Sequence, residues 1–394
     1  MSSREWCIRT IEDVSEEVFS GGTPSTSNKA YWDGEFNWLS SGETRSEFIF
    51  DTEKKITRKA IEESTTKLAK KGSIVIASAG QGKTRGQVSF LCIDTYINQS
   101  IIAISPKSEI IDPLWIYYNL SNRYEELRQL SDSASIRGSL TTKVIKQLKI
   151  SFPESLSSQK RIVDILKSLD EKIELNRQTN ATLEAVAQAI FKEWFVDNRE
   201  VESWKLVPLP EIIEINPQRA VSKNQRTLYI SMSNVPTVGH RAIEWTERPF
   251  NGSGTKFING DTLMAKITPC LENGKTAFVD FLEDGQVGWG STEFIVFRPY
   301  PPLPPEFGYF LARSEELRNH AIQNMVGTSG RQRTPVSCFN HFMVRVPPKD
   351  LSEEFGEISR AIMSTIKAKD EESRTLTQIR DTLLPRLMNG DLEL

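Results

Sequence analysis

The 394-residue chain contains an internal duplication with an offset of roughly 190 residues. Five short sequences of the first half recur, in the same order, in the second half. The pairs are WCIRTIEDVSEEV and WKLVPLPEIIEIN, FNWLSSGET and LYISMSNV, KKGSIVIAS and INGDTLMAK, NQSIIAISP and STEFIVFRP, and LKISFP and FMVRVP. The offset is far longer than the period of a solenoid. Because each half passes into a long charged segment with helical periodicity, the sequence predicts the order domain, helix, domain, helix.

Within each half, short β-rich runs bounded by Gly, Pro, Asn and Asp alternate with helical stretches. The predicted fold class is therefore α/β or α+β, with the strand order left open. We expect a first globular domain over residues 1–156, a central helical segment over 157–200, a second domain over 201–350 and a C-terminal helical segment over 351–394. Two or three domains are expected for this length.

The composition argues against several classes of protein. The four cysteines form no C-x-x-C pair, which disfavours a zinc module or a disulfide scaffold and favours a reducing cytoplasm. No apolar run approaches the ~20 residues that span a bilayer, and the N-terminal sequence lacks the apolar core of a signal peptide. The three histidines have no zinc-hydrolase spacing, and the acidic residues form no nuclease-like cluster. We therefore expect no metal site and no catalytic residue in this chain.

Both long segments carry a seam with alternating steps of four and three residues, apolar at the ends and polar in the middle. The seam of the first is Ile162, Leu166, Leu169, Ile173, Asn176, Asn180, Leu183 and Ile190. The seam of the second is Ile358, Ile362, Lys369, Leu376, Ile379 and Leu383. Antiparallel packing would bring the polar centres together, and a buried polar layer fixes register. The pattern predicts an antiparallel coiled coil within a pseudo-two-fold repeat; two independent surface helices are the alternative.

The sequence IVIASAGQGKTRGQVSFL, residues 74–91, is one residue short of the phosphate-binding pattern G-x-x-x-x-G-K-[ST]. A phosphate-binding loop leads from a strand directly into a helix. Here the alternating apolar residues after Thr84 favour a second strand instead. We therefore expect a hairpin turn that presents Gln81, Lys83, Thr84 and Arg85, and a P-loop ATPase is the less favoured alternative.

Three stretches contain basic residues and no acidic residue: 64–93, 133–153 and 317–349. The last two occupy equivalent places in the repeat, just before each long helix. Although the net charge is −3, local basic stretches are typical of a protein that binds a polyanion through chosen surfaces. For any single cation, a solvated surface charge is the alternative. The candidate DNA-contacting residues are Lys67, Gln81, Lys83, Thr84, Arg85, Arg137, Lys143, Lys266, Lys275, Arg331 and Arg333.

Several segments resemble one family, the specificity (S) subunits of type I restriction–modification enzymes. The sequence QKRIVDILKSLDEKIELNRQTNATLEAVAQAIFKEWFVD is similar to their central spacer, and LTQIRDTLLPRLMNGDLEL to their ending. The sequence SGGTPSTSNKAYWDGEFNWLSSGE resembles the opening of their target recognition domains. Two further segments, GSIVIASAGQGKTRGQV and GDTLMAKITPCLENGKTAFV, resemble their strand–turn–strand element. The resemblance covers the whole chain, and its helix motifs are the most specific.

The resemblance implies two target recognition domains, each reading one half of a split double-stranded DNA site. A helical spacer would dock one modification subunit at each end. Adenine methylation and ATP-driven cleavage would belong to modification and restriction subunits. S-adenosylmethionine, ATP and Mg²⁺ are therefore expected on those partners, and no cofactor on this chain.

The two halves differ in two segments that the resemblance makes important. GGTPS has no equivalent near Asn216, and the turn with Lys83 and Arg85 becomes PCLENGK. An asymmetric DNA site is therefore expected. The partner could instead be a methyltransferase–nuclease fusion, and a coiled-coil scaffold without DNA preference is the alternative from another class.

Overall fold

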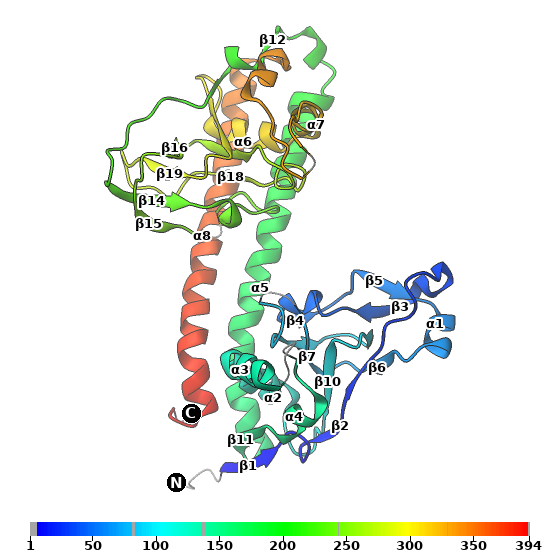
Figure 1. Ribbon diagram of the computed structural model, residues 1–394. Coiled ribbons are helices and arrows are strands. Elements are labelled where there is room, and N and C mark those ends of the chain that lie inside the picture. The colour runs from blue at the N-terminus through cyan, green and yellow to red at the C-terminus, as the bar shows by residue number, and fades with distance from the viewer. Residues whose placement is uncertain (1–5, 81–82, 135–138, 243, 329, 393–394) are drawn as a thin grey trace. The chain divides into compact units, whose positions relative to one another are not determined.

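The chain folds into two compact units of related topology (Figure 1). The computed structural model describes residues 6–80, 83–134, 139–242, 244–328 and 330–392. The first unit comprises Met1–Lys172 and Thr375–Leu394, and the second comprises Ile173–Arg374.

In its described residues, the first unit combines three sheets with four short helices. Its strands are β1 (Trp6–Thr10), β2 (Ser15–Ser20), β3 (Trp32–Leu39), β4 (Phe48–Ile49), β5 (Lys54–Ile56), β6 (Lys67–Ala69), β7 (Ile74–Ala77), β8 (Val88–Leu91), β9 (Thr95–Ile97), β10 (Ile101–Pro106) and β11 (Lys149–Pro153). Its helices are α1 (Arg58–Glu63), α2 (Pro113–Ser121), α3 (Tyr124–Ala134) and α4 (Thr142–Gln147), with 3₁₀ turns η1 (Lys29–Tyr31) and η2 (Glu43–Arg45). The strand orders are β2-β10-β7-β8-β4, β5-β3-β9-β6 and β1-β11.

The second unit repeats this arrangement. Its strands are β12 (Leu206–Pro208), β13 (Ile213–Ile215), β14 (Arg226–Ile230), β15 (Thr246–Pro249), β16 (Thr255–Phe257), β17 (Thr262–Ala265), β18 (Thr276–Phe278), β19 (Gly288–Gly290), β20 (Phe294–Pro299) and β21 (Met343–Arg345). Its helices are α6 (Pro305–Arg313) and α7 (Glu315–Gln323), with 3₁₀ turns η4 (Val201–Ser203), η5 (Leu209–Glu211), η6 (Met232–Asn234) and η7 (Val336–His341). The strand orders are β13-β20-β17-β18, β15-β14-β19-β16 and β12-β21.

The pairings of the two units correspond strand by strand. Strand β10 lies antiparallel between β2 and β7, as β20 does between β13 and β17. Strand β3 runs parallel to β9, as β14 does to β19. Strand β4 is the exception, because no strand takes its place in the described part of the second unit. The predicted mixed fold class and the internal repeat are therefore confirmed.

Local sequence signals explain where several helices begin. Asp112 Oδ1 accepts a hydrogen bond from the Leu114 backbone N–H at 2.9 Å, which caps α2. Pro113 occupies the first turn, where a missing N–H leaves no helical bond unmade. In the same way Ser314 caps α7 through the Leu317 N–H.

Two long helices, α5 (Leu156–Lys192) and α8 (Lys349–Met388), each contribute residues to both units. In the first unit, Ile162 and Leu166 of α5 share a core with Leu387 and Met388 of α8. In the second unit, the rings of Phe191 and Phe355 lie 5.7 Å apart. In each unit, therefore, the α5 and α8 segments run antiparallel, as predicted.

Helix α5 ends at Lys192, before the predicted limit at residue 200. The five residues Glu193–Asp197 that follow form a π-helical turn, η3. This turn directs Phe195 into the core of the second unit, so packing of an aromatic side chain accounts for the change of helix type.

The buried face of α8 corrects the predicted seam by one residue. Ser359, Met363 and Ile366 are buried, whereas Ile379, predicted to lie in the seam, is 42% exposed. In α5, Ile162, Leu166 and Asn176 are buried as predicted. The remaining predicted seam residues are half-buried: Leu169, Ile173, Asn180, Leu183, Ile190, Ile358, Ile362, Lys369, Leu376 and Leu383. The prediction failed at Ile379 because the neighbouring residue, Arg380, takes the inward position by pairing with the buried Asp170 of α5.

The polar centre of α5 faces α8 within the second unit. Asn176 Nδ2 donates to Glu372 Oε2 at 2.8 Å and to Ser373 Oγ at 3.2 Å. Asn180 Nδ2 donates to Asp370 Oδ1 at 2.7 Å. The predicted meeting of the two polar centres is therefore observed.

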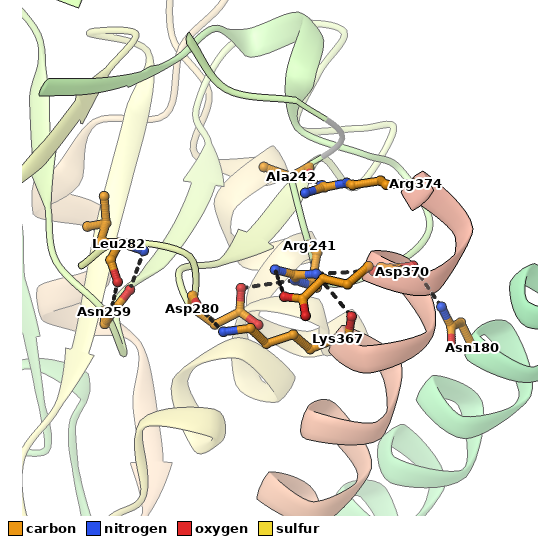
Figure 2. Close-up of polar contacts among 10 residues, drawn as sticks. Asn180, Arg241, Ala242, Asn259, Asp280, Leu282, Lys367, Asp370 and Arg374 are labelled. Carbon is orange, nitrogen blue, oxygen red and sulfur yellow. Dashed lines mark hydrogen bonds and ion pairs between the residues drawn. The ribbon is translucent and has the colours of Figure 1, made fainter. Parts of the chain in front are cut away.

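Arg241 ties α8 to the sheets of the second unit (Figure 2). Its buried guanidinium lies 3.0 Å from Asp280 Oδ1 and 3.8 Å from Asp370 Oδ2. Lys367 Nζ donates to the backbone oxygen of Asp280 at 2.7 Å. The predicted polar layer thus continues into the loops that carry Arg241 and Asp280.

No helix in the described ranges has both the length and the apolarity that crossing a membrane requires.

Candidate nucleic-acid interface

The Gly-rich segment of the first unit is the hairpin turn that the sequence predicts. Strands β7 and β8 pair antiparallel across it, with Ile76 opposite Val88. A strand therefore follows the turn where a phosphate-binding loop would need a helix. Gln81, one of the predicted contacts, lies outside the described residues.

The turn is fastened to α3 rather than fully free. Arg85 forms an ion pair with Asp132, and its side chain is only 13% exposed. The Tyr124 hydroxyl donates to the backbone oxygen of Lys83 at 3.0 Å. Thr84 is buried, whereas Lys83 is exposed. Of these predicted contacts, Lys83 is the one that presents its charge to solvent, and Arg85 shapes the turn.

The other candidates of the first unit lie on separate elements. Lys67, on β6, has its Nζ 3.8 Å from Glu17 Oε1 and 5.4 Å from the centre of the Phe19 ring. Lys143 is exposed on α4. Arg137 lies outside the described residues.

In the second unit, backbone hydrogen bonds bring Lys266 and Arg333 together. The Lys266 N–H donates to the backbone oxygen of Glu293 at 2.9 Å, and the Thr334 N–H donates to the backbone oxygen of Lys266 at 2.8 Å. Ile267 and Arg333 form an antiparallel bridge. We call residues 326–334 the basic segment, because it carries Arg331 and Arg333. Lys266 therefore lies beside this segment.

The cations of this group differ in their partners. The Arg333 guanidinium is paired with Glu293, with Nε 3.0 Å from both carboxylate oxygens. Arg331 is exposed. Lys275 is directed elsewhere, because its Nζ donates to the backbone oxygen of Met232 at 2.8 Å. The structure thus joins three of the four predicted cations of this unit.

The equivalent backbone hydrogen bond exists in the first unit. There the Leu140 N–H donates to the backbone oxygen of Ser78 at 2.9 Å. Ser78 follows β7 as Lys266 follows β17, so the two residues are equivalent in the repeat. Equivalent positions therefore carry a neutral residue in one unit and a cation in the other.

A pocket of about 210 Å³ opens beside Lys266 in the second unit. It is lined by Asn216, Pro217, Gln218, Arg219, Gly254, Thr255, Lys256, Lys266, Thr292 and Phe294. Arg219 and Lys256 escaped the sequence analysis because they lie outside both the acid-free stretches and the two segments that resemble a strand–turn–strand element. The repeat could have found Arg219, since it stands in the segment where GGTPS has no equivalent.

The first unit has a larger polar cavity, of about 360 Å³, beside Glu47, Asp170 and Arg380. Arg380 lies 2.8 Å from Asp170 and 2.9 Å from Glu47. Burial raises the pKa of the Glu47 carboxyl, and the nearby Arg380 charge opposes that rise. Because Arg380 pairs with both carboxylates, these three residues hold the C-terminal part of α8 within the first unit. They leave little uncompensated charge for a ligand. The described residues contain no cluster of His, Cys, Asp and Glu suited to a metal ion.

Comparison with known proteins gives a consistent result. Residues 3–185 match the family model described as the type I restriction modification DNA specificity domain. The MjaIX specificity subunit of a type I restriction enzyme from Methanocaldococcus jannaschii is 23% identical, and the match covers 99% of this chain and 94% of that protein. The HindI specificity subunit from Haemophilus influenzae is also 23% identical, with 83% and 88% covered.

A solved structure supports the fold. The S subunit of a type I restriction-modification system from M. genitalium aligns with a TM-score of 0.60 and 15% identity, over 98% of this chain and 97% of that one. Its likeness concerns the fold. Residues 3–185 thus carry a type I restriction modification DNA specificity domain, and the chain is similar along nearly its whole length to type I restriction enzyme specificity subunits.

Proposed function

We propose that each unit of this chain reads one half of a split, asymmetric DNA sequence. Specificity subunits of this family work in complexes with other restriction–modification subunits and with DNA. The proposal of two different half-sites rests on one observation. The same backbone hydrogen bonds follow β7 and β17, but the residue that makes them is Ser78 in the first unit and Lys266 in the second. One fold used twice with different side chains can read two different base sequences.

Two copies of a modification subunit are the partners that an internal repeat favours. A chain with two equivalent sets of elements presents similar surfaces twice, so each surface can accept the same partner. Adenine methylation, translocation and cleavage would then be the work of the modification and restriction subunits. S-adenosylmethionine, ATP and Mg²⁺ would be bound by those subunits.

Sequencing of DNA methylation in cells tests the proposal. Cells that carry this chain and a modification subunit from the same system should acquire adenine methylation at one new split motif, absent from cells that lack this chain. Exchange of residues 1–156 for the equivalent part of a relative should change one half of the motif and leave the other unchanged. If both halves change, or neither does, the assignment of one half-site to each unit is wrong.

The same experiment also distinguishes separate partner subunits from a methyltransferase–nuclease fusion, and a DNA-reading chain from a coiled-coil scaffold without DNA preference. If methylation appears with a single methyltransferase–nuclease polypeptide as the only partner, the fused alternative holds. If no methylation appears while the same partner is active with another specificity subunit, the chain is a scaffold without DNA preference.

A further inference from the structure

The pocket beside Lys266 has an excess of positive charge. Three of its lining residues are cations, from three parts of the second unit: Arg219 after β13, Lys256 on β16 and Lys266 after β17. None of the described lining residues is acidic. Among the described residues, no ion-pair partner neutralises Lys256 or Lys266. Strand β16, which contributes Thr255 and Lys256 to the lining, is labelled in Figure 1.

Asp261, behind the pocket, does not cancel this charge. It is fully buried and is shared by two guanidinium groups, with Arg219 Nη2 at 2.7 Å and Arg298 Nη1 at 2.6 Å. One carboxylate thus holds two cations in place. The Arg219 Nε atom is buried and has no hydrogen-bond partner in the described structure, so part of its donor capacity remains unused.

The chemistry of the lining suits a phosphate better than a base. Lysine binds phosphate as a point charge, and the hydroxyl of Thr292 and the amide of Gln218 add donors for an acceptor-only oxyanion. Arginine reads guanine with both arms of its fork, but Asp261 occupies one end of Arg219. Phe294 is buried and offers no ring face for stacking.

The first unit does not repeat this pocket. By strand register, Val18 and Ile215 are equivalent, because each faces the equivalent residue of the neighbouring strand. Counting on from them, Gly21 and Gly22 take the places of Gln218 and Arg219. A Cβ atom on Gly22 would lie 2.2 Å from Thr65 Oγ1, and one on Gly21 would lie 1.9 Å from the Ile97 backbone oxygen. The first unit therefore has no room for side chains where the second unit places its donors.

We propose that this pocket binds one phosphate of the DNA backbone, and that the second unit alone makes this contact. The inference rests on the proposed DNA-reading function and adds to it the group that is bound and the half-site that supplies it. Arg331, on the adjoining basic segment, extends the same positive surface. A phosphate held here would fix the register of the second unit on its half-site without reading a base.

The test uses the complex of the full chain with its modification subunit and a DNA fragment carrying the methylated motif. The variants are Lys266→Ala and Lys256→Ala, and the matched control is Lys205→Ala, which makes the same charge change next to β12 and outside the pocket. Each pocket variant should weaken binding roughly tenfold and lower the slope of log K against log salt by about 0.9. The control should leave both quantities close to those of the unaltered complex.

Neutral DNA analogues locate the phosphate. Among methylphosphonates placed one at a time, one in the second unit's half-site should neutralise the phosphate that the pocket binds and so weaken binding of the unaltered complex. At that position Lys266→Ala should show little further loss, because the charge pair is already gone. Thermal unfolding of each variant, unchanged from the unaltered chain, serves as the check on folding.

Three results would overturn the inference. The first is that both pocket variants bind DNA as tightly as the unaltered complex at every salt concentration. This result would overturn the inference even if the DNA-free complex bound inorganic phosphate through these lysines. The second is a changed base preference with an unchanged salt slope, which would identify a base contact. The third is a methylphosphonate effect confined to the first unit's half-site. If the unaltered complex prefers no DNA sequence, the proposed function itself has failed.

Discussion

The Arg380 guanidinium of α8 lies 2.8 Å from the carboxylate of Asp170 in α5. Asp170 is almost fully buried, and its other oxygen accepts a hydrogen bond from the Tyr118 hydroxyl at 2.6 Å. The same guanidinium reaches Glu47 at 2.9 Å. One cation therefore compensates the buried carboxylate of Asp170 and the half-exposed carboxylate of Glu47, and the pairing links the two long helices to the residue that precedes β4.

Replacement of this cation should destabilise the first unit strongly. Removal of one partner from a buried ion pair leaves an uncompensated charge, at a cost of about 3–5 kcal/mol. We therefore expect Arg380→Met to lower the free energy of unfolding by about that amount in urea denaturation. Arg177→Met is the control, because the side chain of Arg177 is 70% exposed and pairs with Glu174 on the same helix. Equal stability of the two variants would contradict the pairing.

The observed seam of α8 makes a second prediction. Ile366 is buried and Ile379 is 42% exposed, although the heptad pattern placed Ile379 in the seam. Truncation of a buried isoleucine leaves a cavity and costs about 2–5 kcal/mol, whereas an exposed one costs about 0.5 kcal/mol or less. We expect Ile366→Ala to lower the unfolding midpoint and Ile379→Ala to leave it nearly unchanged. The reverse order would restore the seam predicted from sequence.

The two long helices show how much of the fold could be predicted from the sequence. Periodicity correctly identified two long helices, their antiparallel pairing and the polar residues at the centre, because these follow from spacing along one chain. It misplaced the seam at Ile379 because Asp170 and Arg380, which are polar, take buried positions by pairing with each other. Such pairings depend on residues far apart in the chain, which periodicity does not contain.

Arg241 should hold α8 in place within the second unit. Its side chain is 3% exposed and lies between Asp280 and Asp370 (Figure 2). Arg241→Met should leave both carboxylates without their shared cation, at a cost of about 3–5 kcal/mol. Hydrogen–deuterium exchange is the suitable measurement, because it locates the effect. We expect faster exchange of α8 amides over residues 360–374 and unchanged exchange over 375–388; uniform acceleration of both would contradict a local role.

The candidate nucleic-acid interface was also predictable only in part, because some of its residues come together only in the folded chain. The acid-free stretch 317–349 contains Arg331 and Arg333, and Lys266 stands in the segment GDTLMAKITPCLENGKTAFV; backbone contacts do bring the three residues together. The acid-free stretch 64–93 also selected Arg85, whose partner Asp132 is 47 residues away in sequence but beside it in space. Arg219 and Lys256 stayed hidden because their neighbourhood forms only when β13, β16 and β17 assemble.

The exposed cations should contribute to DNA affinity without setting base preference. Lys83 and Arg331 are both exposed. We expect Lys83→Ala and Arg331→Ala each to weaken binding of the assembled complex on all sequences alike, and to reduce the salt slope by about one. Fluorescence anisotropy at several salt concentrations measures both effects. Asp132→Asn is the comparison, since it removes a negative charge beside Arg85 and should strengthen binding; weaker binding by Asp132→Asn would assign the ion pair a purely structural role.

His240 should make the second unit sensitive to acid. Burial, with a smaller contribution from the charge of Arg241, lowers the pKa of His240 from 6.5 to about 3. Below pH 6.5 the unfolded chain therefore takes up a proton that the folded chain takes up only near pH 3. Stability is complete above pH 6.5 and falls by about 1.4 kcal/mol for each pH unit between these limits.

Two substitutions isolate this histidine from the other titrating groups. Both ring nitrogens of His240 lack hydrogen-bond partners in the described structure, and the ring lies 6.0 Å from that of Tyr309. A phenylalanine therefore fits the chemistry of the site, and a glutamine keeps its polarity. Between pH 7 and pH 5 the unaltered chain should lose about 2 kcal/mol more stability than either His240→Phe or His240→Gln. Urea unfolding followed by tryptophan fluorescence at the two pH values measures the difference. Parallel losses in all three proteins would mean that His240 titrates in the folded chain as it does in the unfolded one.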